Sequence, residues 1–164
     1  MRVGEPVLTS SGSLPCKAVI HVAGPRWPFG RTKNPTTLTQ EEILLSNGVT
    51  ECLKLANQKG FRSLAIPAIS TGVFGFPVEL AARCILAAVA QFCQLTPVLS
   101  LQEISLTNHD QTTCDVFQRV AMENFSALQV VGTSNTAVPD LEEGECIIAS
   151  CHLPVTFAFA FLMQ

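Results

Sequence analysis

The chain has 164 residues, of which 48% are hydrophobic and 14% charged, and its formal net charge is -3. This length suits one domain that buries its own core, and the apolar composition excludes a disordered chain. The slightly acidic balance argues against general nucleic-acid binding, which requires many Lys and Arg side chains against phosphates, so we expect no direct nucleic-acid partner.

The seven cysteines are spread along the chain without a CxxC pair. Because residues 1–13 contain no apolar leader, we expect reduced thiols and a location in the nucleus and cytoplasm. Cys146, Cys151 and His152 do not have the spacing of a zinc site, so no metal is expected. No stretch reaches the roughly 18 to 20 apolar residues of a membrane span, and we therefore expect none.

The first third of the chain predicts a hairpin and a buried strand. β-rich stretches flank the turn Ser10–Ser13, which is typical of a hairpin. Residues 18–23 are apolar on both faces apart from His21, which predicts a central strand in which His21 is a hydrogen-bonded core residue. The following segment 26–35 is rich in proline, glycine and basic residues, which indicates a surface loop.

A helix is predicted next. Thr39 and Glu42 form a capping-box pattern at its start, and Gly60 marks its end. Gly48 lies in the middle of this helix, where glycine costs about 1 kcal/mol relative to alanine. A buried strand is expected over residues 61–69.

Strands and helices alternate through the rest of the first 125 residues. Apolar residues recur at helical spacing after Pro77, which suits a first helical position; they are Val78, Ala81, Ala82, Ile85, Leu86, Val89 and Phe92. A strand is expected over 99–106 and a helix over 110–125. This alternation predicts an α/β fold with a mainly parallel sheet and helices on both faces.

The chain changes character from about residue 132. A polar linker leads into an alternating apolar run, in which residues 155, 157, 159 and 161 would share one face of a strand. Two alternatives stay open: this run adds an edge strand to the sheet, or it is an unpaired apolar tail.

The loop between the strand ending near Ile69 and the helix starting near Pro77 is the candidate site. It reads Ser-Thr-Gly-Val-Phe-Gly-Phe and contains no charged residue. Its two glycines allow consecutive N–H groups to turn toward one point, at a helix start where an anion is favoured. An ordinary strand–helix turn with two core aromatics, Phe74 and Phe76, is the alternative reading.

Two motifs in order, CKAVIHVAGPRW and SLAIPAISTGVFGFPVELAARCI, resemble the macrodomain family, and the likeness looks closest to the macrodomains of poly(ADP-ribose) polymerases. The resemblance implies a three-layer α/β/α sandwich with a mixed, mainly parallel sheet. It implies ADP-ribose as ligand, free or attached to proteins, so that ADP-ribosylated proteins are the expected partners. No cofactor is implied.

The resemblance also assigns the ligand-binding residues. The loop that wraps the diphosphate and the distal ribose corresponds to Ser70, Thr71, Gly72, Val73, Phe74 and Gly75, with Phe74 beside the ribose. Asn108 and His109, after the later strand, would lie near the adenine. For Asn108 a simple turn role is equally compatible, and Asp110 is expected to cap the following helix.

The ends of the chain depart from the family pattern. Residues 1–131 resemble a partial macrodomain that lacks its N-terminal strands and first binding loop, so the sheet is expected to be incomplete at the N-terminus. Residues 132–164 look like a non-family tail. The expected function is an ADP-ribose reader weakened by truncation. The alternatives are a non-binding truncated form and, less favoured because no catalytic residue is predicted, an ADP-ribosylhydrolase.

Overall fold

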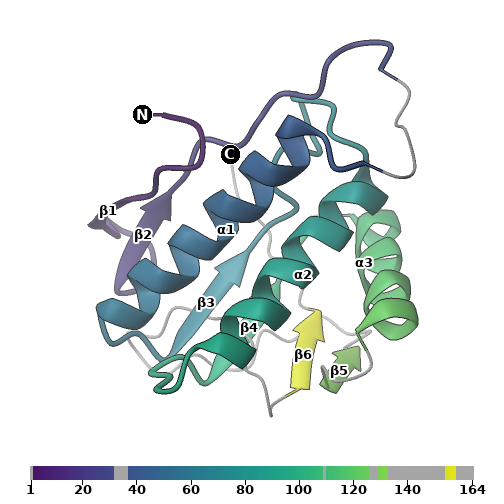
Figure 1. Cartoon of the computed structure of the whole chain (residues 1–164). Helices are drawn as coiled ribbons and strands as arrows, with labels where there is room; N and C mark the ends of the chain where they lie inside the picture. Colours follow the sequence, from purple (N-terminus) through teal and green to yellow (C-terminus); the bar gives the residue numbers. More distant parts are fainter. Residues whose placement is uncertain (1, 32–36, 109, 126–128, 133–153, 158–164) are drawn as a thin grey trace.

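The computed structural model describes residues 2–31, 37–108, 110–125, 129–132 and 154–157. Within them the strands and helices alternate as predicted (Figure 1). In chain order the elements are β1 (Val7–Ser10), β2 (Ala18–His21), α1 (Gln40–Gln58), β3 (Ser63–Ile66), α2 (Val78–Leu95), β4 (Glu103–Leu106), α3 (Gln111–Asn124), β5 (Gln129–Gly132) and β6 (Pro154–Phe157).

The main sheet is parallel, as the alternation of elements predicts. Its strand order is β3-β4-β6-β5, and every pair of neighbours in it is parallel. Leu64 of β3 lies opposite Ile104 of β4, and Ile66 lies opposite Leu106. The carboxyl ends of β3 and β4 therefore meet at one edge, and the loops that follow them are neighbours.

The predicted hairpin is confirmed, but its second strand is not a central strand. β1 and β2 pair antiparallel, with Val7 opposite His21, and form a separate two-stranded sheet. His21 is exposed, and its Nε2 lies 2.9 Å from Thr9 Oγ1 across the hairpin. The core position predicted for His21 is therefore wrong. Among the described residues β2 pairs with β1 alone, so its last residue lies at the margin of the fold.

Helix α1 begins with the predicted capping box. The Glu42 N–H donates to Thr39 Oγ1 at 3.2 Å, and the Thr39 N–H donates to Glu42 Oε2 at 2.9 Å. The helix continues through Gly48. Glycine at this position allows the N-terminal segment to cross α1 closely, because a Cβ on Gly48 would lie 3.2 Å from the Gly4 Cα. Gly60 follows the helix with φ +72, the left-handed conformation that ends helices.

Replacing Thr39 by alanine tests this cap. We expect Thr39→Ala to lower the free energy of unfolding by about 1 kcal/mol, because the amide of Glu42 loses its acceptor. Urea denaturation followed by circular dichroism measures the change. Thr39→Ser keeps the hydroxyl and should unfold at nearly the wild-type urea concentration; an equal loss in both variants would contradict the role of the hydroxyl.

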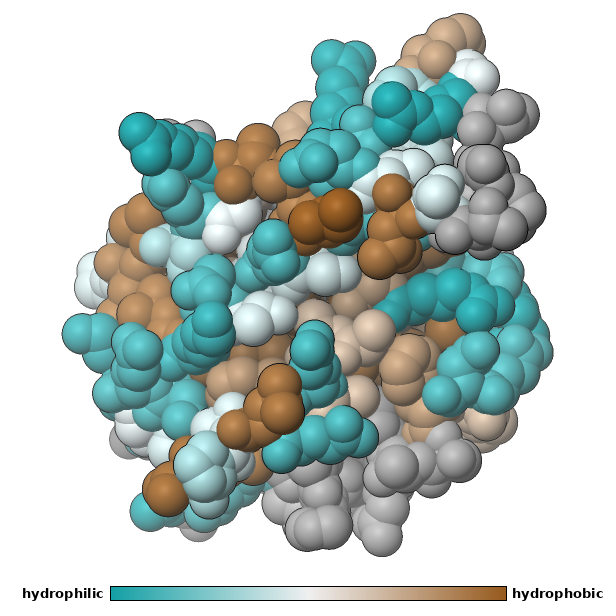
Figure 2. All heavy atoms as spheres, in the orientation of Figure 1, coloured by the Kyte–Doolittle hydropathy of each residue, from teal (hydrophilic) through white to brown (hydrophobic). Residues whose placement is uncertain are grey.

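The core lies between the helices and the parallel sheet. In Figure 1, α1 and α2 lie side by side in front of the strands, and α3 packs beside α2. The most deeply buried large side chains come from all three helices, from β4 and from the end of the loop before α2; they include Leu45, Leu53, Phe76, Ile85, Ile104 and Phe117. Hydrophilic side chains cover much of the face seen in Figure 2, and apolar residues lie between them in separate groups.

Part of the C-terminal segment joins the parallel sheet. β6 lies between β4 and β5, with Thr156 opposite Ser105 of β4 and opposite Val131 of β5. Neither of the two alternatives, an edge strand or an unpaired tail, describes residues 154–157, which occupy an interior position in the sheet. The rest of the alternating run, including 159 and 161, lies outside the described residues.

Helix α2 is long and apolar enough, by length and composition, to cross a membrane. In this fold it is a core helix: eight of its residues, among them Ile85 and Leu86, are buried against the rest of the protein. Core helices of water-soluble domains commonly have this composition, so the composition of α2 does not by itself indicate a membrane span. The expectation that no segment spans a membrane stays a prediction.

The described cysteines are outside disulfides with one exception. Cys16, Cys52, Cys84 and Cys114 form no disulfide, as expected, whereas Cys93 is disulfide-bonded. The expectation of a fully reduced chain is therefore wrong at Cys93, which is only half-buried near the end of α2. Within the described residues, no group of His, Cys, Asp and Glu side chains is arranged to hold a metal ion.

Candidate functional site

The loop of residues 70–76 connects the carboxyl end of β3 to α2 and is folded into a closed turn. Ser70 has φ +70, which is unusual for a residue other than glycine. Its carbonyl oxygen accepts a hydrogen bond from the Phe76 N–H at 3.0 Å, which brings the two ends of the loop together. Gly75, with φ +65, supplies the second left-handed residue.

Three consecutive amides in this loop are free to bind a ligand. The Thr71 N–H donates to the Ala68 carbonyl and the Gly75 N–H donates to the Gly72 carbonyl, so these two amides are already used. In the described part of the chain, the amides of residues 72, 73 and 74 make no hydrogen bond. Of the loop residues assigned to the ligand, Gly72, Val73 and Phe74 therefore have the amides that are available to it.

The start of α2 adds to this site. Pro77 is the N-cap residue and makes no side-chain cap, so the first amides of the helix lie next to the loop without a capping oxygen. Glu79 is the acidic residue nearest the site in sequence, and it contacts Arg119 and Arg83. The Arg119 guanidinium, and then that of Arg83, hold the pKa of Glu79 below its ordinary value. These two cations compensate its negative charge, which would otherwise repel an anion.

The two aromatic residues of the loop have different environments. Phe74 is 42% exposed, whereas Phe76 is 1% exposed and belongs to the core. The Phe76 ring lies 4.9 Å from the Trp27 ring, centroid to centroid, and the Trp27 N–H donates to the Phe74 carbonyl at 2.9 Å. Only Phe74 is available to contact a ligand; Phe76 anchors the loop to the segment that follows β2.

Gly24 allows the segment that follows β2 to lie close to the loop of residues 70–76. A Cβ on Gly24 would overlap Ser70 Oγ and would lie 2.6 Å from Ile69 Cγ2. The Ser70 hydroxyl oxygen is itself buried and has no hydrogen-bond partner among the described residues. The loop of residues 70–76 can therefore take this position only if residue 24 is a glycine.

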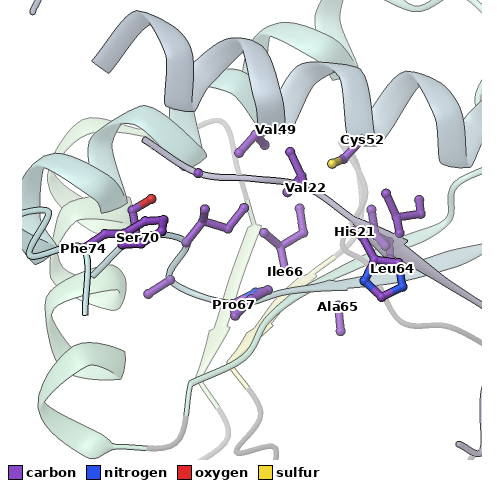
Figure 3. A pocket seen from close by; sticks show the side chains of 14 residues that line it. His21, Val22, Val49, Cys52, Leu64, Ala65, Ile66, Pro67, Ser70 and Phe74 are labelled. Atoms are coloured by element: carbon purple, nitrogen blue, oxygen red, sulfur yellow. The ribbon is translucent and has the colours of Figure 1, made fainter. Parts of the chain in front are cut away.

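A cavity of about 520 Å³ opens beside the loop. Figure 3 shows Ser70 and Phe74 at one end of it and His21 with Leu64 at the other, with Val49 and Cys52 above. It lies between β2 and β3, which belong to different sheets and do not pair. Most of its lining is aliphatic, so the cavity favours an apolar surface next to the polar loop.

Cys52 lines this cavity as a neutral thiol. Burial, and then the charge of Glu51, raise its pKa to about 12. We expect Cys52 to resist alkylation by iodoacetamide at pH 8, because the thiolate is the reactive form. Peptide mass spectrometry should show modification of the half-buried Cys16 first. Both should react in urea; rapid labelling of folded Cys52 would contradict its burial.

The structure separates the three predicted residues after β4. Asn108 is 6% exposed, and its Oδ1 accepts a hydrogen bond from the Ala68 N–H at 2.9 Å. It does not line the cavity. His109 lies outside the described residues. Asp110 caps α3, as expected, by accepting a hydrogen bond from the Thr113 N–H at 2.8 Å.

The sequence predicts no role for two residues of this site, Gly24 and Trp27. Both lie in the motif CKAVIHVAGPRW, and Trp27 also lies in the predicted surface loop 26–35. A glycine directly after a strand is the only local signal, and it is weak, because its reason is a contact with Ser70, 46 positions away.

The sequence profile of the Macro domain family matches residues 1–85. An O-acetyl-ADP-ribose deacetylase of Enterobacter cloacae is 33% identical over 127 residues, which cover 77% of this chain and 66% of the relative. The chain thus spans just under two thirds of that relative's length.

Solved structures show the same fold. A macrodomain of Oceanobacillus iheyensis with ADP has a TM-score of 0.64 at 30% identity, covering 76% of this chain and 60% of that one. A mutant of the same macrodomain with ADPR also has a TM-score of 0.64, at 29% identity, covering 77% of this chain and 62% of that one. The α/β architecture is therefore that of a macro domain, consistent with the expected three-layer sandwich. This chain belongs to the Macro domain family.

Proposed function

We propose that this chain binds ADP-ribose through the loop of residues 70–76, and that it recognises the same group on ADP-ribosylated proteins. The observation that carries the proposal is the row of three unbonded amides at residues 72–74, directly before the uncapped start of α2. Such an array holds a phosphate without a basic side chain. The macrodomain with ADPR supports the same ligand.

The neighbouring residues suggest how the nucleotide lies. With the diphosphate on the loop amides, Phe74 borders both the loop and the mouth of the cavity, where a ribose would meet its ring. Asn108 is bonded to Ala68 and lies outside the cavity lining, so a direct contact between it and the base has no support from its position.

Isothermal titration calorimetry with ADP-ribose tests this function. We expect saturable heat and a higher unfolding temperature with ADP-ribose, a weaker response with ADP, and none with adenosine, because the loop holds the phosphates. A protein carrying ADP-ribose should be retained on the immobilised chain and released by free ADP-ribose. No heat and no thermal shift at millimolar ADP-ribose would instead support the non-binding alternative.

Hydrolysis of O-acetyl-ADP-ribose is a second candidate function, favoured by the name of the Enterobacter cloacae relative. The likeness to macrodomains of poly(ADP-ribose) polymerases suggested by the motifs would instead favour a reader. His21 is the imidazole that lines the cavity, at the end opposite Phe74. Acetate release from O-acetyl-ADP-ribose separates the two functions: a reader binds the compound and leaves it intact, and a deacetylase releases acetate over many turnovers.

A further inference from the structure

The geometry points to Asn108 as a positioning residue that holds the ligand-binding loop in the arrangement that leaves its three amides free, without touching the ligand. This inference rests on the proposed function, because it concerns the same loop. It replaces the predicted contact between Asn108 and the adenine with a mechanical role.

The parallel pairing of β3 and β4 places Asn108 against the start of the loop. The ladder between these strands is extended by one more bond, in which the Thr107 N–H donates to the Ile66 carbonyl at 3.0 Å. The next residue, Asn108, then faces Ala68, and its Oδ1 accepts the Ala68 N–H at 2.9 Å. Because Asn108 is 6% exposed, water competes poorly for this bond.

Hydrogen bonds to Ala68 connect Asn108 to the rest of the loop. Its carbonyl accepts two hydrogen bonds from Thr71, from the N–H at 3.2 Å and from Oγ1 at 2.8 Å. Both backbone polar groups of Ala68 are therefore fixed, one by Asn108 and one by Thr71. The left-handed Ser70 lies inside this turn, and the free amides begin at residue 72 directly after it.

The rest of the Asn108 side chain forms no bond that draws it away from Ala68. Its Nδ2 is buried and bonds to no nitrogen or oxygen among the described residues, and the Asn108 side chain also interacts with the Cys114 thiol in the first turn of α3. Asn108 is also absent from the cavity lining, which separates it from Ser70 and Phe74. The oxygen is thus the functional atom of the side chain, and a variant that keeps an oxygen there should keep the loop in place.

Asn57 offers a matched control at the opposite end of β3 and β4. It is an asparagine that also joins two segments: its Oδ1 accepts from the Ser100 N–H at 2.7 Å, and its Nδ2 donates to the Val98 carbonyl at 3.2 Å. Asn57→Ala removes a comparable side-chain tether without contacting the loop. Asn108→Asp keeps an oxygen in place of Oδ1, and Asn108→Ala removes it.

Two measurements are made on each variant: ADP-ribose affinity by calorimetry well below the unfolding temperature, and amide hydrogen exchange at Ala68 and Thr71. We expect Asn108→Ala to weaken the affinity about fivefold and to speed exchange at both amides, because the loop arrangement with three free amides would then be only partly populated. Asn108→Asp should bind within about twofold of wild type. Asn57→Ala should lower the unfolding temperature and leave affinity and loop exchange unchanged.

Each contrary result overturns a stated part of the inference. Wild-type affinity in Asn108→Ala, or an equal loss in Asn57→Ala, would show that the tether does not position the loop for binding. Unchanged hydrogen exchange at Ala68 and Thr71 in Asn108→Ala would show that the tether does not hold the loop at all. The exchange measurement tests this role even if the wild type does not bind ADP-ribose. A wild type that does not bind would overturn the proposed function and not the tether. Should the alanine variant not fold, Asn108→Leu, which has a similar shape and no oxygen, takes its place.

Discussion

Gly72→Glu is expected to weaken ADP-ribose binding at least about 100-fold while leaving the fold intact. The new carboxylate would lie beside the three free amides at residues 72–74 and would repel the diphosphate, and a like-charge contact of this kind costs several kcal/mol. Binding measured by calorimetry at low and at high salt separates repulsion from bulk, because salt screens the repulsion.

The structure has space for a side chain at position 72 without a change in the fold. A Cβ on Gly72 meets no atom within 4 Å, and its φ does not lie in the left-handed region. The carbonyl of Gly72, which accepts from Gly75, is unaffected by a side chain. Gly72→Gln, with nearly the same volume and no charge, should retain more affinity than Gly72→Glu. Wild-type affinity in the glutamate variant would remove the loop from the binding site.

Gly24→Ala is the second large effect we expect, and it acts on both stability and binding. The added methyl would overlap Ser70 Oγ and press against Ile69 Cγ2, so the two loops must separate. Overpacking of this kind lowers the free energy of unfolding by about 1–3 kcal/mol. Because Ser70 moves with the loop, the affinity for ADP-ribose should fall at least about tenfold.

A double-mutant cycle with Ser70→Ala identifies the cause. Removing Oγ relieves the closest overlap, and Ser70→Ala by itself should cost little stability because that oxygen is buried without a partner. The double variant should recover part of the stability lost in Gly24→Ala, with the Ile69 contact accounting for the rest. Gly72→Ala, where a Cβ meets nothing, is the control for adding a methyl near the site. Strictly additive losses would contradict the contact between the two loops.

The elements that local chemistry specifies could be predicted from the sequence. Thr39 and Glu42 define the start of α1 through bonds only three residues apart, and Asp110 defines the start of α3 in the same way. The apolar spacing from Val78 onward fixes the buried face of α2. The candidate loop was also found from its composition, since two glycines without a charged residue, before a proline and a helix, form a local pattern.

What depends on pairing between distant strands could not be predicted. Residues 18–23 have the composition of a central strand, yet in the part of the chain that the structure describes β2 pairs only with β1, and His21 is exposed as a result. The run after Pro154 alternates as an edge strand would, yet β6 lies between β4 and β5. Composition specifies that a strand buries its side chains, but it does not specify which neighbours bury them.

The sequence by itself therefore determined the order of strands and helices, the helix caps and the position of the glycine loop, because each of these follows from contacts within a few residues. Only the tertiary structure decided which of the loop amides are free, that Phe76 packs on Trp27 while Phe74 stays exposed, and that Asn108 bonds to Ala68. The physical reason is that Phe76 and Trp27, like Asn108 and Ala68, meet only when β2, β3 and β4 are placed, and the turn that uses the Thr71 and Gly75 amides lies between these two contacts.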